Sequence, residues 1–142
     1  MSDPLDAKLD LNLRVADLER SIDWYTRVFG APPIYRGVDR TLDGRATGLA
    51  CFRLGGVKLW LMPGPAGRVE NGQRVGIALM TRQPLPDLRR VLERRGAQFD
   101  DQPIADFPVG PDGVRRGLDA EFFYILDPDG HRIEYCRVLS PG

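Results

Sequence analysis

The chain has 142 residues, with 20 basic and 20 acidic side chains and a formal net charge of zero. This length suits one domain that buries a core without disulfides, and a neutral chain has no overall field to attract nucleic acid or an anionic membrane. Two cysteines do not form a disulfide framework, and neither a signal peptide nor a bilayer-spanning apolar run is seen. We therefore expect a cytoplasmic protein with reduced thiols and with no nucleic-acid or membrane partner.

The first half of the chain predicts a strand, a helix and three further strands. Residues 8–15 alternate strictly between apolar and polar side chains, which is typical of a strand with one buried face. Apolar residues then recur at helical spacing between Asp17, a suitable N-cap, and Gly30, a suitable C-terminal residue. Strands are expected at about 34–38, 46–54 and 57–62, and Gly55-Gly56 joins the last two as a tight hairpin.

The same order of elements is predicted again in the second half. Residues 64–74 are rich in Pro and Gly and read as a linker. After it we expect a strand at 75–80, a helix from Pro86 to Gly96, and strands at about 97–104, 120–126 and 131–138. The sequence therefore predicts an α+β fold of two tandem βαβββ modules, about 7–63 and about 75–139, within a single domain.

Two segments of the chain resemble motifs of a known family. The segment LRVADLERSIDWY from Leu13 and the segment DPDGHRIEY from Asp127 are similar to the opening and closing motifs of the vicinal oxygen chelate superfamily. That superfamily includes the glyoxalase, bleomycin-resistance and extradiol-dioxygenase types. The resemblance implies a cup-shaped mixed sheet with helices outside, one small-molecule cavity, and a homodimer whose modules pair within or between chains.

The resemblance also implies where a metal would bind, namely at the first and last strand of each module. Asp10 and Gly76 fall at positions that commonly hold His in the family, and Trp60 and Glu134 at positions that commonly hold Glu. A glycine offers no side chain, and an indole offers only an N–H donor. We therefore expect no cofactor and no tightly bound metal. A weakly held divalent ion on Glu134 and Asp10 is the alternative.

Strand alternation places several candidate site residues on the cup side of the sheets. Glu134 and Asp10 are the candidate acid/base pair, and the alternative is that Arg14, Lys58 or Arg132 neutralises them as plain ion pairs. For the pocket wall, either Phe52 or Cys51 is expected to join the predicted ligand-contacting set, and the basic members of that set favour an anionic ligand. That set is Trp60, Asn12, Arg14, Lys58, Met62, Arg132 and Cys136.

Two side-chain groups are expected to have no part in the site. His131, the only histidine, lies beside the closing turn and on the opposite strand face from Glu134, so a structural role is expected. The arginines of the second helix are expected to form a solvated outer face. They are Arg89, Arg90, Arg94 and Arg95.

These observations leave two functions open. One is an enzyme of the lyase or isomerase type that transfers protons without a metal, using Glu134 and Asp10. The other is a bleomycin-resistance-like protein that sequesters a small molecule without converting it. Glyoxalase I activity in its usual metal-dependent form is disfavoured, and so is extradiol dioxygenase activity, which needs two His and a carboxylate around Fe(II).

Overall fold

A computed structural model of the protein describes residues 2–39, 47–64 and 68–139. The first module forms a four-stranded sheet in the order β1-β4-β3-β2. Strand β1 pairs in parallel with β4, and the other neighbours are antiparallel. Its elements are β1 (Asp10–Val15), α1 (Leu18–Phe29), β2 (Tyr35–Asp39), β3 (Thr47–Leu54) and β4 (Val57–Pro63).

The second module repeats this arrangement with one addition. Its sheet has the order β5-β9-β8-β6, β5 is parallel to β9, and the short strand β7 pairs with β8 beside that path. A 3-10 turn, η1 (Asn71–Gln73), precedes the sheet. The remaining elements are β5 (Gly76–Met80), α2 (Leu85–Arg94), β6 (Gln98–Phe99), β7 (Arg115–Gly117), β8 (Ala120–Leu126) and β9 (Arg132–Val138).

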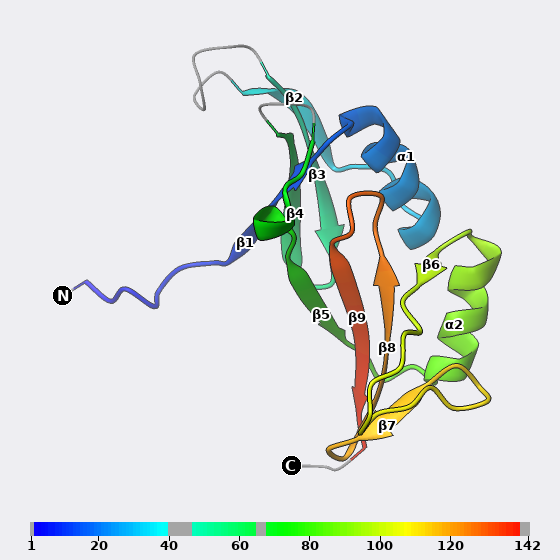
Figure 1. Cartoon of the computed structure of the whole chain (residues 1–142). Helices are drawn as coiled ribbons and strands as arrows, with labels where there is room; N and C mark the ends of the chain where they lie inside the picture. Colours follow the sequence, from blue (N-terminus) through cyan, green and yellow to red (C-terminus); the bar gives the residue numbers. More distant parts are fainter. Residues whose placement is uncertain (1, 40–46, 65–67, 140–142) are drawn as a thin grey trace.

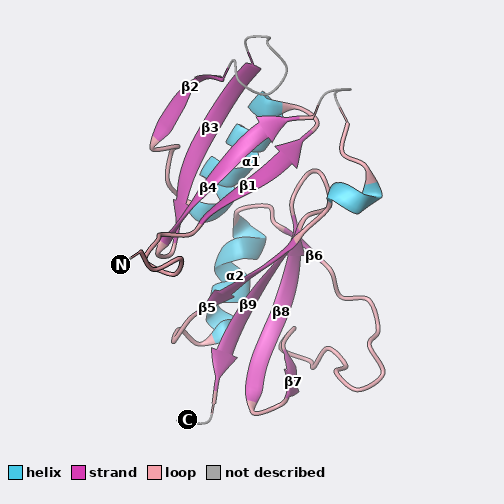
Figure 2. Ribbon diagram, turned by 90° about the vertical axis from the view of Figure 1, so that its left-hand side faces the viewer, coloured by secondary structure: helices cyan, strands magenta, loops and turns pink. Residues whose placement is uncertain are grey.

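Both sheets carry their helix on the same side of the molecule (Figure 1). Figure 2 looks onto the opposite side, where the strands of both sheets lie in front of the two helices. We call this helix-free surface of the two sheets the open face. The α+β class and the pair of βαβββ modules are thus confirmed, and the strands form two separate mixed sheets that are not closed. The helices have 12 and 10 residues, and no helix of the described residues is long and apolar enough to cross a membrane.

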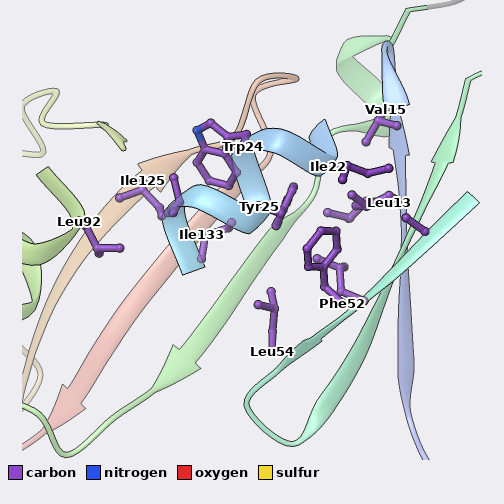
Figure 3. Packing of buried hydrophobic residues seen from close by; sticks show 14 of the residues in the cluster. Leu13, Val15, Ile22, Trp24, Tyr25, Phe52, Leu54, Leu92, Ile125 and Ile133 are labelled. Carbon is purple, nitrogen blue, oxygen red and sulfur yellow. The ribbon is translucent and has the colours of Figure 1, made fainter. Parts of the chain in front are cut away.

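Helix α1 belongs to the core of both modules. Asp17 caps its start by accepting a hydrogen bond from the Arg20 backbone N–H at 3.1 Å, and Gly30 ends it with a φ of 78°. Figure 3 shows α1 between the strands of the two sheets, with Ile22 on the side of β1 and Trp24 on the side of Ile125. One continuous apolar cluster therefore spans the two modules, and α1 is its shared layer.

The turn between β8 and β9 supplies the polar part of the same junction. The carboxylate of Asp129, a residue only 7% exposed, accepts hydrogen bonds from the Ala16 backbone N–H at 3.0 Å and the Ser21 hydroxyl at 3.4 Å. The Tyr25 hydroxyl donates to Asp127 at 2.8 Å. These bonds tie β1 and α1 of the first module to the last hairpin of the second.

His131 completes this junction and has the structural role expected for it. It is fully buried, and its Nδ1 accepts a hydrogen bond from the Val75 backbone N–H at 3.1 Å. The proton must then be on Nε2, which lies 2.6 Å from the Arg14 carbonyl oxygen and donates to it. The imidazole therefore has both nitrogens engaged by backbone and faces away from the open face.

One predicted strand is wrong in length, because 97–104 is regular only over Gln98–Phe99. The carbonyls of Asp100 and Gln102 accept hydrogen bonds from the guanidinium of Arg115 instead of from a neighbouring strand. Pro103 also removes a donor from this segment. The chain then returns as β7, a strand that was not predicted.

The predicted solvated face of α2 is wrong for Arg89. Its side chain is 12% exposed and lies over the ring of Phe99, with Cζ 4.0 Å from the ring centroid. It forms ion pairs with Glu93 and Asp101 and donates to the Gly113 carbonyl at 2.8 Å. Hydrogen bonding to Arg89 lowers the pKa of Asp101. Arg89 therefore fastens α2 to the irregular segment that follows β6.

The junction leads to a stability prediction for Asp129→Ala. Removing this carboxylate leaves buried N–H and O–H donors of the first module without an acceptor, so the free energy of unfolding should fall by about 2–4 kcal/mol. Urea denaturation followed by circular dichroism measures it. Asp23→Ala, an exposed change on α1, is the matched control and should stay within about 0.5 kcal/mol of the wild type. Equal effects of the two changes would contradict the role assigned to Asp129.

Candidate functional site

Six predicted site residues lie together on the open face of the first sheet. The opposite sides of the same two strands carry buried leucines and Val15 against α1, so strand alternation directs the polar side chains outward. In the parallel register, Asp10 lies beside Lys58, Asn12 beside Trp60, and Arg14 beside Met62. The guanidinium of Arg14 donates to the Pro63 carbonyl at 3.4 Å, at the end of the sheet away from Asp10.

Asp10 and Trp60 are bonded to each other. The Trp60 indole Nε1 donates to Asp10 Oδ2 at 3.1 Å, and the Tyr35 ring packs edge-on against the indole with centroids 6.0 Å apart. Cys51 pairs with Trp60 across the sheet and is buried on this face, whereas Phe52 packs in the core against Tyr25. Of the two candidates, Cys51 thus belongs to the site face, and its burial raises the pKa of its thiol.

The second sheet contributes Arg132, Glu134 and Cys136, which share the open face of β9. Tyr124 of β8 lies directly opposite Glu134, and the guanidinium carbon of Arg132 is 4.2 Å from the centroid of the Tyr124 ring. These groups border a hollow of about 170 Å³. Its lining residues are Gly76, Ile77, Ala78, Tyr124, Arg132 and Glu134.

The half-buried Glu134 forms no ion pair with any residue that the structure describes, and neither does Asp10. The alternative in which Arg14, Lys58 or Arg132 neutralises these carboxylates therefore finds no support within the described chain. Burial raises the pKa of the Tyr124 hydroxyl, and the charge of Glu134 raises it further. Burial and Glu134 also raise the pKa of the Cys136 thiol, so neither group ionises readily at neutral pH.

Strand register relates the two modules residue by residue. Asp10 lies beside Lys58, two residues before Trp60, and Gly76 lies beside Arg132, two residues before Glu134. Asp10 thus corresponds to Gly76, and Trp60 to Glu134. We call Asp10 with Trp60 the first corner, and Gly76 with Glu134 the second corner. Within one chain these two corners lie on separate sheets, and the hollow beside Glu134 is lined by the second module alone. The structure therefore does not bring Asp10 and Glu134 into one pocket of a single chain.

A family model described as the Glyoxalase/Bleomycin resistance protein/Dioxygenase superfamily matches residues 9–135. The chain belongs to this superfamily. No curated protein matches the chain at a significant level.

Solved structures of the superfamily share the fold at low identity. A glyoxylase/bleomycin resistance protein/dioxygenase domain from Frankia sp. EAN1pec is 19% identical, with a TM-score of 0.65 and coverage of 97% of this chain and 96% of that one. A glyoxalase/bleomycin resistance protein from Catenulispora acidiphila is 19% identical, with a TM-score of 0.61 and coverage of 94% and 99%. The fosfomycin resistance protein FosX from Listeria monocytogenes, in complex with Mn(II) and sulfate, is 17% identical, with a TM-score of 0.58 and coverage of 94% and 93%. Identities this low establish the fold and not the reaction.

The four residues of the two corners do not fit the metal centre that resemblance to this superfamily implies. Trp60 has no lone pair for a cation and instead donates its N–H to Asp10, and Gly76 has no side chain. Among the described residues, no three His, Cys, Asp or Glu side chains are placed to hold a metal ion. Structural and catalytic metal sites usually have three or four protein ligands. The reaction proposed for this protein therefore uses only its side chains.

Tyr124 is a site residue that sequence reasoning missed, although the signal was present. The hairpin turn closes between Asp127 and His131, with Gly130 at a positive φ as its extra residue, and counting outward from this pair places residue 124 opposite residue 134. Arg115, which lies 5.5 Å from the same ring, had no comparable signal, because the loop that buries it carries no periodic pattern.

The contact between Glu134 and Tyr124 makes a prediction about ionisation. Glu134→Gln should lower the pKa of Tyr124, because the negative charge that opposes formation of the phenolate is removed. Ultraviolet difference absorbance of phenolate, followed against pH, measures this shift, and Tyr124→Phe identifies which transition belongs to Tyr124. If the curves of the wild type and Glu134→Gln coincide, the two groups do not interact.

Proposed function

We propose that the protein binds a small organic acid at the hollow beside Glu134 and catalyses metal-independent proton transfer of the lyase or isomerase type. The observation that carries this proposal is the half-buried Glu134 carboxylate, which lines the hollow and has no ion-pair partner in the described chain. Glu134 would take a proton from a substrate carbon and return it. We place this activity in the cytoplasm, where the free thiols Cys51 and Cys136 would stay reduced.

Tyr124 suits a supporting role in this reaction. Its raised pKa keeps the hydroxyl protonated at neutral pH, so it can donate a hydrogen bond to the negative charge that develops when a carbon loses its proton. The phenol stands directly across from Glu134, so base and donor would face the same substrate.

The small volume of the hollow and the exposed apolar side chains of the open face support a homodimer. Small-molecule pockets usually enclose about 300–1,000 Å³, and this hollow has about 170 Å³. The open face also exposes large apolar side chains, namely Tyr35 at 52%, Met80 at 64% and Val138 at 55%. Strands β1 and β5 are both sheet edges, and unprotected edges favour association. A second copy would cover these features.

A two-fold axis through the open face would bring unlike modules together. The Asp10 and Trp60 corner of one copy would then stand opposite the Glu134 corner of the other, with Asp10 as the second acid/base group. Asn12, Lys58 and Met62 of the first copy would complete the wall around the substrate.

The alternative function is sequestration of a small molecule without chemistry. The observation that favours it is the pair of aromatic rings on the first sheet, where Trp60 and Tyr35 offer flat apolar surface for a planar ligand. In this case Asp10 would only orient the indole, through the hydrogen bond that it accepts.

Deuterium uptake tests the proposed reaction without knowledge of the product. A panel of small carboxylic acids with a hydrogen on the carbon next to the carboxylate or to a ketone is incubated with protein in deuterium oxide and followed by proton NMR. The wild type should exchange that hydrogen in at least one compound, and Glu134→Gln should slow the exchange by at least about a hundredfold. Glu121→Gln, on the neighbouring strand β8, is the matched control and should retain the rate.

The results separate the two functions. Equal rates of exchange by Glu134→Gln and the wild type would contradict the proposed role of Glu134 as the base. Saturable binding of a compound with no exchange anywhere in the panel would favour sequestration.

A mixing experiment tests the shared site. Asp10→Asn and Glu134→Gln should each be inactive alone, whereas their mixture should regain about a quarter of the wild-type rate, because half of the reassorted dimers hold one intact site of two. Light scattering should give the mass of a dimer for all three proteins. A monomeric mass, or a mixture as inactive as its components, would contradict a site built from two copies.

A further inference from the structure

A buried arginine without a carboxylate partner lies next to the proposed site. Arg115 is 1% exposed, and its guanidinium donates to the backbone carbonyls of Phe107 at 2.8 Å, Asp100 at 3.2 Å and Gln102 at 2.7 Å. Its Nε is buried with no hydrogen-bond partner. No acidic side chain of the described chain forms an ion pair with it.

Such an arrangement is costly to keep for stability alone. Burying a cation without a counter-charge carries a large desolvation penalty, and an apolar residue of similar volume is often as stable or more stable at such a site. The three carbonyl dipoles hold the guanidinium in place, and no carboxylate of the described residues forms an ion pair with it, although its charge helps to lower the pKa of Asp101.

The geometry places that charge in the Glu134 site. Arg115 pairs with Phe122 across the strands, so its side chain lies on the same face of the sheet as Tyr124. The guanidinium carbon is 5.5 Å from the centroid of the Tyr124 ring, and that of Arg132 is 4.2 Å from the same ring. The two guanidinium groups outnumber the single carboxylate of Glu134, so the site carries a net positive charge.

We propose that this site recognises a small oxyanion, either a carboxylate or a phosphate-type group, through Arg132, and that Arg115 is a positioning residue that supplies a second, fixed positive charge. Arg132 is exposed, and its guanidinium lies over the Tyr124 ring and donates no hydrogen bond to the described residues. Its guanidinium N–H groups can therefore bind an oxyanion in bidentate fashion. Arg115 cannot reach the ligand, because it is buried and both of its terminal nitrogens donate to the loop. This inference rests on the proposed site, and it names the class of substrate.

The spacing along β9 also sets the form of the substrate. Arg132 and Glu134 are two residues apart on one face, which corresponds to about 7 Å along a strand. An acid whose oxyanion binds Arg132 would therefore present a carbon only a few bonds away to Glu134.

Binding of two simple probes, inorganic phosphate and acetate, tests the inference with the full chain. Dissociation constants are measured by NMR titration for the wild type, Arg132→Gln, Arg115→Met, Arg115→Lys and Glu134→Gln. We expect Arg132→Gln to weaken binding at least about tenfold and Arg115→Met several-fold. Glu134→Gln should bind the probes more tightly, because a like charge is removed. Arg137→Gln, on the opposite face of β9, is the matched control and should bind as the wild type does.

Each result decides a part of the inference. Failure of the wild type to bind either probe, or unchanged binding by Arg132→Gln, would overturn it. Unchanged binding by a folded Arg115→Met would remove Arg115 from the site. If Arg115→Met does not fold, Arg115→Lys decides, since it keeps the charge: binding within about threefold of the wild type supports the role of charge, and a loss as large as that of Arg132→Gln rejects it.

The probes also separate this inference from the proposed reaction. Tighter binding of phosphate assigns a phosphate-type substrate, and tighter binding of acetate assigns a carboxylate. Probe binding that depends on Arg132, without deuterium exchange in any compound, would reject the catalytic function while the oxyanion site stands. Exchange that depends on Glu134 but not on Arg132 would reject the oxyanion site while the catalytic function stands.

Discussion

The rest of the structure depends on how the turn between β8 and β9 docks onto the first module. Asp129 accepts hydrogen bonds from β1 and α1, and Tyr25 and His131 link the same turn to the buried layer between the sheets. Because these partners are buried, the modules are held in one relative orientation. In that orientation both sheets turn their helix-free surface to the same side (Figure 2). The docking thus gives the chain one open face with two unlike halves.

The two halves share one order of strands and helix but differ in their site residues. In the first module the corner residues satisfy each other, since the Trp60 indole donates to Asp10. In the second module one corner residue is Gly76, and the other, Glu134, lines an open hollow together with Tyr124 and Arg132. The first corner therefore offers an aromatic wall, and the second offers the reactive groups. A site that uses both needs the two to face each other, which the separate sheets of one chain do not allow.

Sequence reasoning succeeded where a period or a turn determines the outcome. Alternation assigned Asp10, Trp60 and Glu134 to the open face, and the Asp127–Gly130 turn located the last hairpin. It failed where a single long side chain reorganises a loop. Arg115 takes the carbonyls that would have extended β6, and Arg89 is drawn in by Asp101 and Phe99. Neither contact has a sequence period, so the shortened strand, the added β7 and the buried guanidinium all required the folded structure.

The charges around Tyr124 weigh on the choice between catalysis and sequestration. A protein that only held a planar ligand would need the rings of the first sheet, and a carboxylate on the opposite wall would repel an anion. The second module keeps Glu134 without an ion-pair partner in the described chain, and the guanidinium groups of Arg115 and Arg132 lie against the ring of Tyr124 opposite it. An anion held by Arg132 would meet a base at Glu134 and a proton donor at Tyr124. This set of charges therefore supports the proposed proton transfer to and from a small acid over sequestration.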